Sequence, residues 1–105
     1  MGQVIWTEKA SAHLKAIHDY IAEDSPIYAT RFIKALIKAT LKLETFPLAG
    51  RSVPEFEHTP INLHEVIYKG YRIIYRLNPD SNVEVVTVAH GREDLLNNLN
   101  KEWIL

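Results

Sequence analysis

The sequence predicts an α+β fold: a small, mainly antiparallel four-stranded sheet covered on one face by an αα-hairpin, in the order β-α-α-β-β-β with a short C-terminal helix. Apolar residues recur at helical spacing in two segments between residues 8 and 43. Three β-rich runs separated by turn residues occupy residues 63–92. The 105 residues contain no repeat or linker, so we expect a single domain over residues 1–105.

The first half of the chain is expected to form one strand and both helices. A short apolar run at residues 3–6 predicts the strand, and Thr7 is placed to cap the helix that follows. Ser25 and Pro26 are typical of the N-cap and first position of a second helix, which we expect to extend to about Leu43. The inner faces of the helices are expected to hold Ala10, Leu14, Ile17, Ile21, Ala29, Phe32, Ile33, Leu36, Ile37 and either Thr40 or Leu41.

Two further segments follow the helices and the strands: a long one without periodicity, and a short one at the end of the sequence. Residues 47–62 contain three prolines and no periodicity, and loops of this length are often functional. Residues 94–105 begin with helical spacing of leucines and end in Trp103-Ile104-Leu105. We therefore expect a long loop before the last three strands and a short helix after them.

The last three strands are expected to form a meander. A two-residue turn at Lys69-Gly70 pairs Ile67 with Arg72, and a turn centred on Asp80 pairs Arg76 with Glu84. One face is then nearly all apolar and is predicted to lie under the helices; it holds Val66, Tyr68, Tyr71, Ile73, Tyr75, Leu77, Val83, Val85, Thr87 and Ala89. The other face is predicted to be an open groove of charged and aliphatic residues; it holds Glu65, Ile67, Arg72, Ile74, Arg76, Glu84, Val86, Val88, His90 and Arg92. A slip of one residue would move the last strand to the opposite face.

Composition narrows the classes of function. There is no cysteine, which excludes disulfides and thiolate chemistry, and no histidine has the spacing of a zinc ligand, so we expect no metal and no cofactor. The net charge of −1 lacks the basic excess typical of proteins that bind a phosphate backbone, and therefore favours a protein partner. No segment resembles a signal peptide or a membrane span, so we expect a cytoplasmic protein without a membrane contact.

The charged residues of the groove admit two interpretations. Glu65, Arg72 and His90 together have the residue types for in-line cleavage of RNA, as base, phosphate clamp and acid. Alternatively, Arg72 forms a salt bridge to Glu65, and His90 is hydrogen-bonded scaffold. Arg51, beside a glycine in the long loop, is a candidate for anionic ligands or for a link to Glu55 or Glu57. Arg76 and Glu84 are expected to form a structural ion pair.

The sequence resembles the RelE/ParE toxin superfamily from about Val4 to Leu95. The resemblance lies in the helical hairpin, the segment Pro47-Leu48-Ala49-Gly50-Arg51, the strand Tyr71-Arg72-Ile73-Ile74-Tyr75 and the strand end Ala89-His90-Gly91-Arg92. It implies a toxin of a type II toxin–antitoxin module that forms a heteromeric complex with a small cognate antitoxin. The long paired helices and the His-Gly-Arg strand end are closer to the ParE branch.

The resemblance implies two alternative activities. ParE-like members inhibit DNA gyrase without chemistry of their own, and in that case Arg51, Arg72, His90 and Arg92 would contact the target or a ParD-like antitoxin. RelE-like members cleave mRNA on the ribosome, and in that case Glu65, Arg72 and His90 would be catalytic. The near-neutral charge favours the gyrase inhibitor over the enzyme. An inactive member that only binds its antitoxin is a third alternative.

Overall fold

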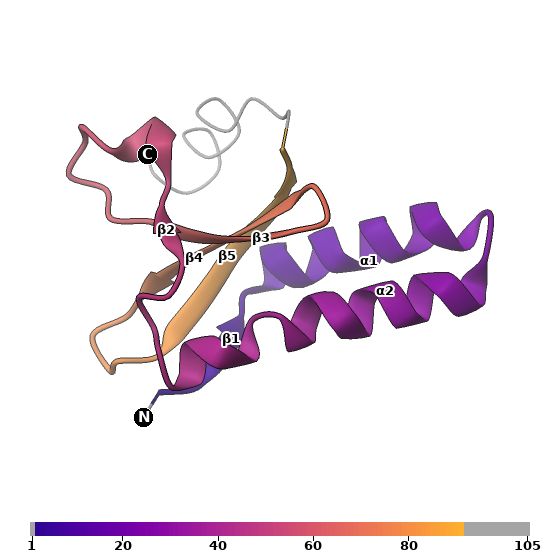
Figure 1. Ribbon diagram of the computed structural model, residues 1–105, viewed down its shortest axis with the longest axis horizontal. Coiled ribbons are helices and arrows are strands. Elements are labelled where there is room, and N and C mark those ends of the chain that lie inside the picture. Colours follow the sequence, from indigo (N-terminus) through magenta and orange to yellow (C-terminus); the bar gives the residue numbers. More distant parts are fainter. Residues whose placement is uncertain (1, 92–105) are drawn as a thin grey trace.

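Figure 1 shows a computed structural model of the protein, which describes residues 2–91. Two helices lie against one side of a five-stranded, mostly antiparallel sheet, which confirms the predicted α+β class. The elements are β1 (Val4–Trp6), α1 (Glu8–Ala22), α2 (Pro26–Lys38), the 3-10 helix η1 (Leu41–Glu44), β2 (Arg51–Ser52), the 3-10 helix η2 (Pro54–Phe56), β3 (His64–Tyr68), β4 (Tyr71–Leu77) and β5 (Val83–His90). The expected C-terminal helix lies outside the described residues.

Both helices begin where capping residues predict. The Thr7 hydroxyl accepts a hydrogen bond from the Ala10 amide at 3.1 Å, and the Ser25 hydroxyl accepts one from Tyr28 at 3.2 Å. The second helix ends at Lys38, earlier than expected. There the Thr40 hydroxyl donates to the Ile37 carbonyl at 2.7 Å, and the Thr40 amide donates to the same carbonyl. These i−3 bonds tighten the chain into a turn that leads to η1.

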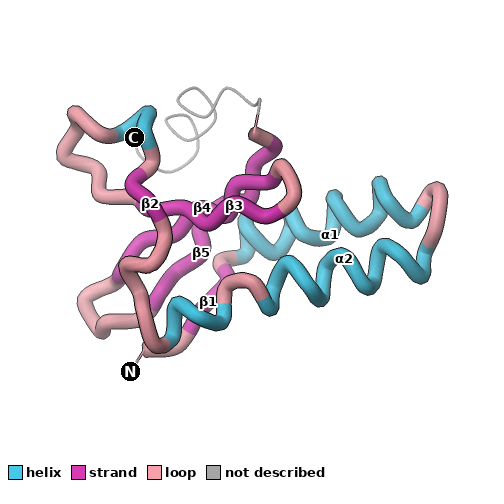
Figure 2. The backbone as a smooth tube through the Cα atoms, viewed as in Figure 1, coloured by secondary structure: helices cyan, strands magenta, loops and turns pink. Residues whose placement is uncertain are grey.

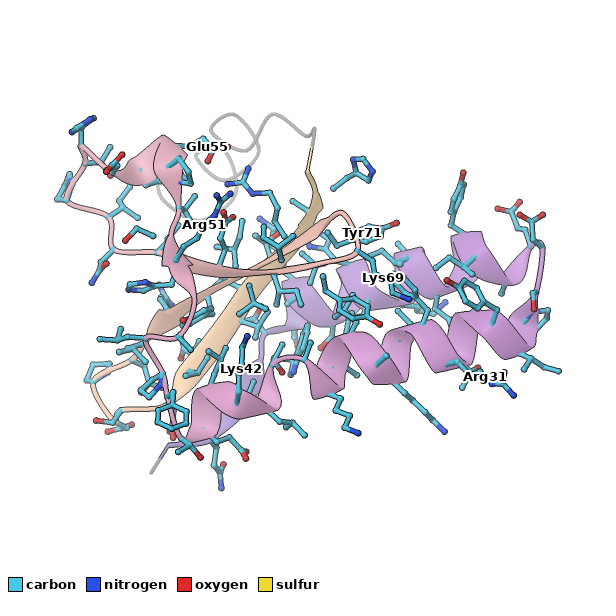
Figure 3. All side chains as sticks on the ribbon, in the orientation of Figure 1. Arg31, Lys42, Arg51, Glu55, Lys69 and Tyr71 are labelled. Carbon is cyan, nitrogen blue, oxygen red and sulfur yellow. The ribbon has the colours of Figure 1, made fainter. Side chains whose placement is uncertain are left out.

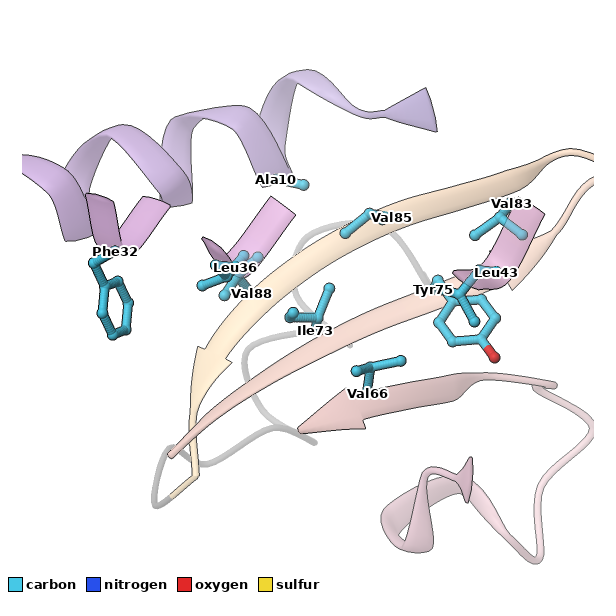
Figure 4. Close-up of a cluster of buried hydrophobic side chains, with 10 residues drawn as sticks. All are labelled: Ala10, Phe32, Leu36, Leu43, Val66, Ile73, Tyr75, Val83, Val85 and Val88. Carbon is cyan, nitrogen blue, oxygen red and sulfur yellow. The ribbon is translucent and has the colours of Figure 1, made fainter. Parts of the chain in front are cut away.

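The main core lies between the helices and the sheet, as Figure 4 shows. Its buried members come from α1, α2, η1 and three strands; they are Ala10, Phe32, Leu36, Leu43, Val66, Ile73, Tyr75, Val83, Val85 and Val88. Leu14, Ile17, Ile21 and Ile33 pack against this cluster and stay partly exposed. The helix faces that periodicity predicted therefore do cover the sheet.

The sheet has the strand order β1-β5-β4-β3-β2, and β1 runs parallel to β5. The hairpin of β3 and β4 has the predicted register, with Ile67 opposite Arg72 and Glu65 opposite Ile74. Its turn residues Lys69 and Gly70 have φ angles of 46° and 86°. Positive φ at both positions matches a two-residue turn that follows the twist of the strands.

The predicted register of β5 is correct at its start and wrong beyond it. Arg76 does lie opposite Glu84, but a β-bulge follows, and Arg72 then pairs with Ala89 instead of Val88. The bulge adds Val86 to β5 without a partner on β4, so the rest of the strand changes face relative to the prediction. Val88 accordingly joins the main core, and Ala89 moves to the opposite face.

The long loop contains a fifth strand that the sequence analysis did not predict. Arg51 and Ser52 form β2, which pairs with Glu65 and His64 at the edge of the sheet. Figure 2 shows the chain after β2 passing through a short helix and returning by loop to β3. This segment encloses a second buried cluster on the face away from the helices, made of Val53, Phe56, Leu63, Ile74, Val86 and Ala89. That face was expected to be an open groove, and this cluster makes part of it a second core.

Candidate functional site

Four charged side chains form a continuous ion-pair network on the sheet face away from the helices. Glu65 of β3 and Arg72 of β4 are buried, with side chains 0% and 8% exposed. Glu55 comes from η2 and Arg51 from β2, both in the loop segment that folds over this face. Figure 3 shows Arg51 and Glu55 side by side on this part of the molecule. The network contains two cations and two anions, so its formal charges cancel.

Arg72 is the centre of the network. Its two terminal nitrogens donate to the two carboxylate oxygens of Glu55 at 2.6 and 2.7 Å, and its Nε donates to Glu65 at 2.6 Å. A planar guanidinium is suited to this geometry because its donors form a rigid fork. Both interpretations of Arg72 expected a carboxylate or phosphate on this fork. The structure shows it engaged by two carboxylates of the protein itself.

The electrostatic coupling appears in the pKa values. Hydrogen bonding to Glu55, and then to Glu65, raises the pKa of Arg72 above its ordinary value, although burial acts in the opposite direction. Hydrogen bonding to Arg72 lowers the pKa of Glu55. At neutral pH both groups of this pair are therefore ionised.

Arg51 lies at the outer end of the network. Its Nε donates to the second oxygen of Glu65 at 2.5 Å, and its side chain is 60% exposed. A link to Glu55 or Glu57 was the structural expectation for Arg51, and the partner is Glu65 instead, because β2 pairs directly with β3. The terminal nitrogens of Arg51 make no hydrogen bond with the described part of the protein, so this fork is available to a ligand.

Gly50 and Tyr75 hold the chain that leads into Arg51. The Tyr75 hydroxyl donates to the Pro47 carbonyl at 2.7 Å and accepts from the Gly50 amide at 3.0 Å. A Cβ at Gly50 would lie 2.6 Å from the Glu65 carbonyl oxygen and 2.7 Å from the Tyr75 hydroxyl. Only glycine fits this approach, which explains why the residue before Arg51 has no side chain.

A shallow cavity of about 330 Å³ lies over the network. The residues that line it include Arg51, Pro54, Glu55, Ile67, Gly70 and Arg72. Ile67 is 50% exposed and supplies an apolar wall beside the charged groups. The cavity therefore offers one accessible guanidinium, one partly exposed carboxylate and an apolar contact, a combination suited to binding a polar segment of a partner.

The structure does not bring His90 into this site. His90 lies opposite Tyr71, one residue along from the pair of Arg72 and Ala89, so its side chain is on the helix side of the sheet. Its ring contacts Tyr71 edge-on, with ring centres 5.6 Å apart. The expectation that Glu65, Arg72 and His90 share one face is therefore wrong, and the bulge in β5 is the reason. Arg92 lies outside the described residues.

Glu55 was predicted only as a partner of Arg51, and its membership of the network was not predicted. A signal was present: a buried arginine needs anionic partners, and Glu65 alone cannot engage all three donor positions of the fork. The ion pair of Arg76 with Glu84 is confirmed at 2.8 Å and lies on the exposed part of the sheet. Within residues 2–91, no group of three histidine, aspartate or glutamate side chains is arranged to hold a metal ion.

No helix in the described part of the chain has the length and apolar character needed to cross a membrane. A model of the family described as the ParE toxin of the type II toxin-antitoxin system parDE matches residues 4–95. The curated protein Toxin RelE2 of Caulobacter vibrioides is 33% identical over 91 residues, which cover 87% of this chain and 97% of that protein.

A solved structure described as the chromosomal ParDE TA system from P. aeruginosa is similar with a TM-score of 0.70. The match covers 86% of this chain and 96% of the solved chain, at 19% sequence identity. At that identity the likeness concerns the fold. It agrees with the helical hairpin and meander described above.

Proposed function

Because the chain belongs to the ParE family of type II toxin–antitoxin toxins, we propose that it arrests growth by binding DNA gyrase and has no catalytic activity of its own. The observation that carries the proposal is that the candidate catalytic groups Glu65 and Arg72 are paired with other side chains of the protein itself. Glu65 is fully buried between two arginines, and Arg72 is engaged by Glu55 and Glu65. A general base must reach the proton it removes, and a phosphate clamp must have donors to offer.

The position of His90 supports the same proposal. An RNA-cleaving site built on Glu65 and Arg72 would need its acid on their face of the sheet, whereas His90 packs on Tyr71 on the other face. What remains near the network is an exposed arginine beside a shallow cavity. Such a surface is suited to recognition of a partner carboxylate rather than to bond cleavage.

We propose that a small ParD-like antitoxin binds this toxin in a heteromeric complex. The solved relative is described as a ParDE toxin–antitoxin system, and the fold is shared. Of the residues expected to meet the target or the antitoxin, Arg51 is the primary contact in this proposal and Arg72 holds the network behind it. His90 lies beside Tyr71 on the other face of the sheet and, in this proposal, contacts the antitoxin rather than the target. Arg92 follows the last described residue of the chain.

A ribosome-dependent mRNA endonuclease is the second candidate function. One observation favours it: the curated relative at 33% identity carries the name RelE2. In this candidate, Glu65, Arg72 and His90 would need to be brought together by the ribosome. That requires breaking the bidentate pair of Arg72 with Glu55 and moving His90 across the sheet.

Supercoiling by purified DNA gyrase in the presence of the purified toxin tests the proposal. We expect inhibition at micromolar toxin and its reversal when antitoxin is bound first. Unchanged supercoiling would contradict the gyrase target, and A-site cuts of mRNA in a translation extract would establish the endonuclease instead. Normal growth after induction of the toxin without antitoxin would identify an inactive member.

A further inference from the structure

The Tyr75 side chain joins the main core to the chain segment that enters β2. Its ring is fully buried between the helices and the sheet, and it stacks on His64 of the neighbouring strand with ring centres 5.6 Å apart. Figure 4 shows the ring beside Leu43, with the hydroxyl pointing away from the middle of the cluster. The ring therefore belongs to the core, while the hydroxyl reaches the loop that passes beside it.

The Tyr75 hydroxyl anchors residues 47–50 to the rest of the protein. It donates to the Pro47 carbonyl at 2.7 Å and accepts from the Gly50 amide at 3.0 Å. Within the described chain, these two hydrogen bonds are the ones that connect residues 47–50 to another helix or strand. The side chains of the segment add little, because Leu48 is 63% exposed and the residue after it is exposed as well.

Packing alone does not account for a tyrosine at this position. Phenylalanine would place the same ring in the core without a hydroxyl that needs partners, and burying an unpaired hydroxyl costs free energy. Burial also raises the pKa of Tyr75, so the hydroxyl keeps its proton at neutral pH and can donate and accept at the same time. The contribution of the hydroxyl to the structure is therefore its pair of hydrogen bonds to the loop.

Arg51 follows directly after the anchored segment. The strand β2 contains only Arg51 and Ser52, both exposed, so pairing with β3 gives this residue few ladder bonds. The Nε of Arg51 donates to Glu65, and its side chain lines the shallow cavity. Because Gly50 is the preceding residue, a shift of its backbone would carry the Arg51 guanidinium with it. The place of the guanidinium at the cavity therefore depends on where the Tyr75 hydroxyl holds Gly50.

We propose that Tyr75 is a positioning residue, whose hydroxyl holds Gly50 so that the Arg51 guanidinium meets a carboxylate of the partner protein. This role rests on the proposed function, in which Arg51 is the primary contact. Tyr75 is 0% exposed and is not among the described residues that line the cavity, so it acts on affinity through Arg51. Charge-assisted hydrogen bonds are short and directional, so a displaced fork binds less tightly. Removing the hydroxyl lowers affinity without removing any group that the partner touches.

The first measurement uses the full chain without a partner. Amide hydrogen exchange followed by NMR should be slow at Gly50, which donates to a buried hydroxyl, and fast at Leu48, whose amide makes no hydrogen bond within the described residues. This comparison in the wild type stands whether or not a variant folds. Tyr75→Phe should accelerate exchange at Gly50 about tenfold and shift the Nε–H signal of Arg51. The control is Tyr68→Phe, which removes a hydroxyl without a hydrogen bond to a described residue and should leave both signals unchanged.

The second measurement compares the affinities of wild type, Tyr75→Phe, Arg51→Gln and the double variant. Titration calorimetry with the ParD-like antitoxin and inhibition of gyrase supercoiling are the two assays. In the assay that responds to Arg51→Gln, we expect Tyr75→Phe to weaken binding about three- to tenfold. It should add less than about twofold when Arg51 is already glutamine, because the group that it positions is gone. Tyr68→Phe should bind like the wild type, and circular dichroism confirms that each variant is folded.

Three results would overturn the positioning role. One is exchange at Gly50 as fast as at Leu48 in the wild type, because the hydroxyl would then not hold the loop. Another is a folded Tyr75→Phe protein that binds like the wild type while Arg51→Gln binds weakly. The third is additive losses in the double variant, which would mean that Tyr75 acts independently of Arg51. Unchanged affinity of Arg51→Gln in both assays would contradict the proposed contact itself, and the positioning role with it.

Discussion

Arg72 holds Glu55 through both of its terminal nitrogens, at 2.6 and 2.7 Å, across 17 positions of the sequence. The pair joins β4 to η2 and so fixes the loop segment that covers the second buried cluster. The same contact occupies the guanidinium that a ribonuclease would need for phosphate. One interaction therefore stabilises the fold of the loop and limits the chemistry of the site.

Replacing Glu55 by alanine should destabilise the protein by about 1.5–3 kcal/mol, the usual value for hydrogen bonds to charged groups. Arg72 would keep Glu65 but lose its two bonds to the loop. Urea unfolding measures the change in free energy. The matched control is Glu57→Ala, an exposed residue near the end of η2, which should change stability by less than about 0.5 kcal/mol. Equal effects would show that the pair does not anchor the loop.

The same pair predicts how stability depends on pH. Arg72 lowers the pKa of Glu55 in the folded protein below the ordinary value of 4.5. Between the folded and the unfolded pKa of Glu55, the unfolded chain binds more protons than the folded protein does. The free energy of unfolding that the ion pair contributes is therefore complete above about pH 4.5 and is lost as the pH falls through the folded pKa. Urea midpoints measured across this window should fall more steeply for wild type than for Glu55→Ala. Parallel curves would contradict the assignment.

Substituting Arg72 by lysine should cost about 1.5–3 kcal/mol, even though the charge is kept. A single ammonium group cannot engage both oxygens of Glu55 and also Glu65, which is fully buried. Arg76→Lys is the control, because its pair with Glu84 is exposed and should lose less than about 1 kcal/mol. Equal midpoints for the two variants in urea would show that the fork geometry of Arg72 is not needed.

Local sequence patterns predicted the helices and the first hairpin because caps, turn residues and periodicity act over a few positions. Thr7, Ser25 and the Lys69-Gly70 turn are examples. The bulge at Val86 escaped prediction because valines, suited to either buried face, occupy the strand on both sides of it. One added residue was enough to move His90 away from Arg72.

Two members of the ion-pair network could be predicted from local sequence, and the other two could not. The pairing of Glu65 and Arg72 across a hairpin follows from its register, which the turn sets. Glu55 and Arg51 come from a loop without periodicity, and their positions depend on β2 reaching the edge of the sheet. Only the requirement that all donors of a buried guanidinium be hydrogen-bonded pointed towards a second carboxylate, because Glu65 engages the Nε alone.

Removing the imidazole by His90→Ala should leave growth inhibition intact. The ring packs on Tyr71 on the helix side of the sheet, away from Arg72 and Glu65, so it has no place in a cleavage reaction there. Growth after induction without antitoxin, together with supercoiling by gyrase, measures the effect. Loss of activity in a folded His90→Ala protein, accompanied by loss of mRNA cleavage, would restore the enzyme hypothesis.

Arg51→Gln should weaken binding of the antitoxin or the target with little change in stability. Its side chain is 60% exposed and Glu65 keeps Arg72 as a partner, so the loss of folding free energy should stay near about 1 kcal/mol. The terminal nitrogens that face the cavity would be lost, and a charged pair with a partner carboxylate typically costs about tenfold or more in affinity when one side is removed.

The control for Arg51 is Arg76→Gln, which removes the same charge from an arginine that is 45% exposed and paired with Glu84 outside the cavity lining. Titration calorimetry with the antitoxin, and supercoiling with gyrase, compare the two variants. A fall in affinity confined to Arg51→Gln supports a contact at the cavity, and the assay in which it occurs identifies the partner. Equal affinities for wild type, Arg51→Gln and Arg76→Gln in both assays would remove the cavity from the binding surface, because among the described residues that line it Arg51 carries the one exposed guanidinium.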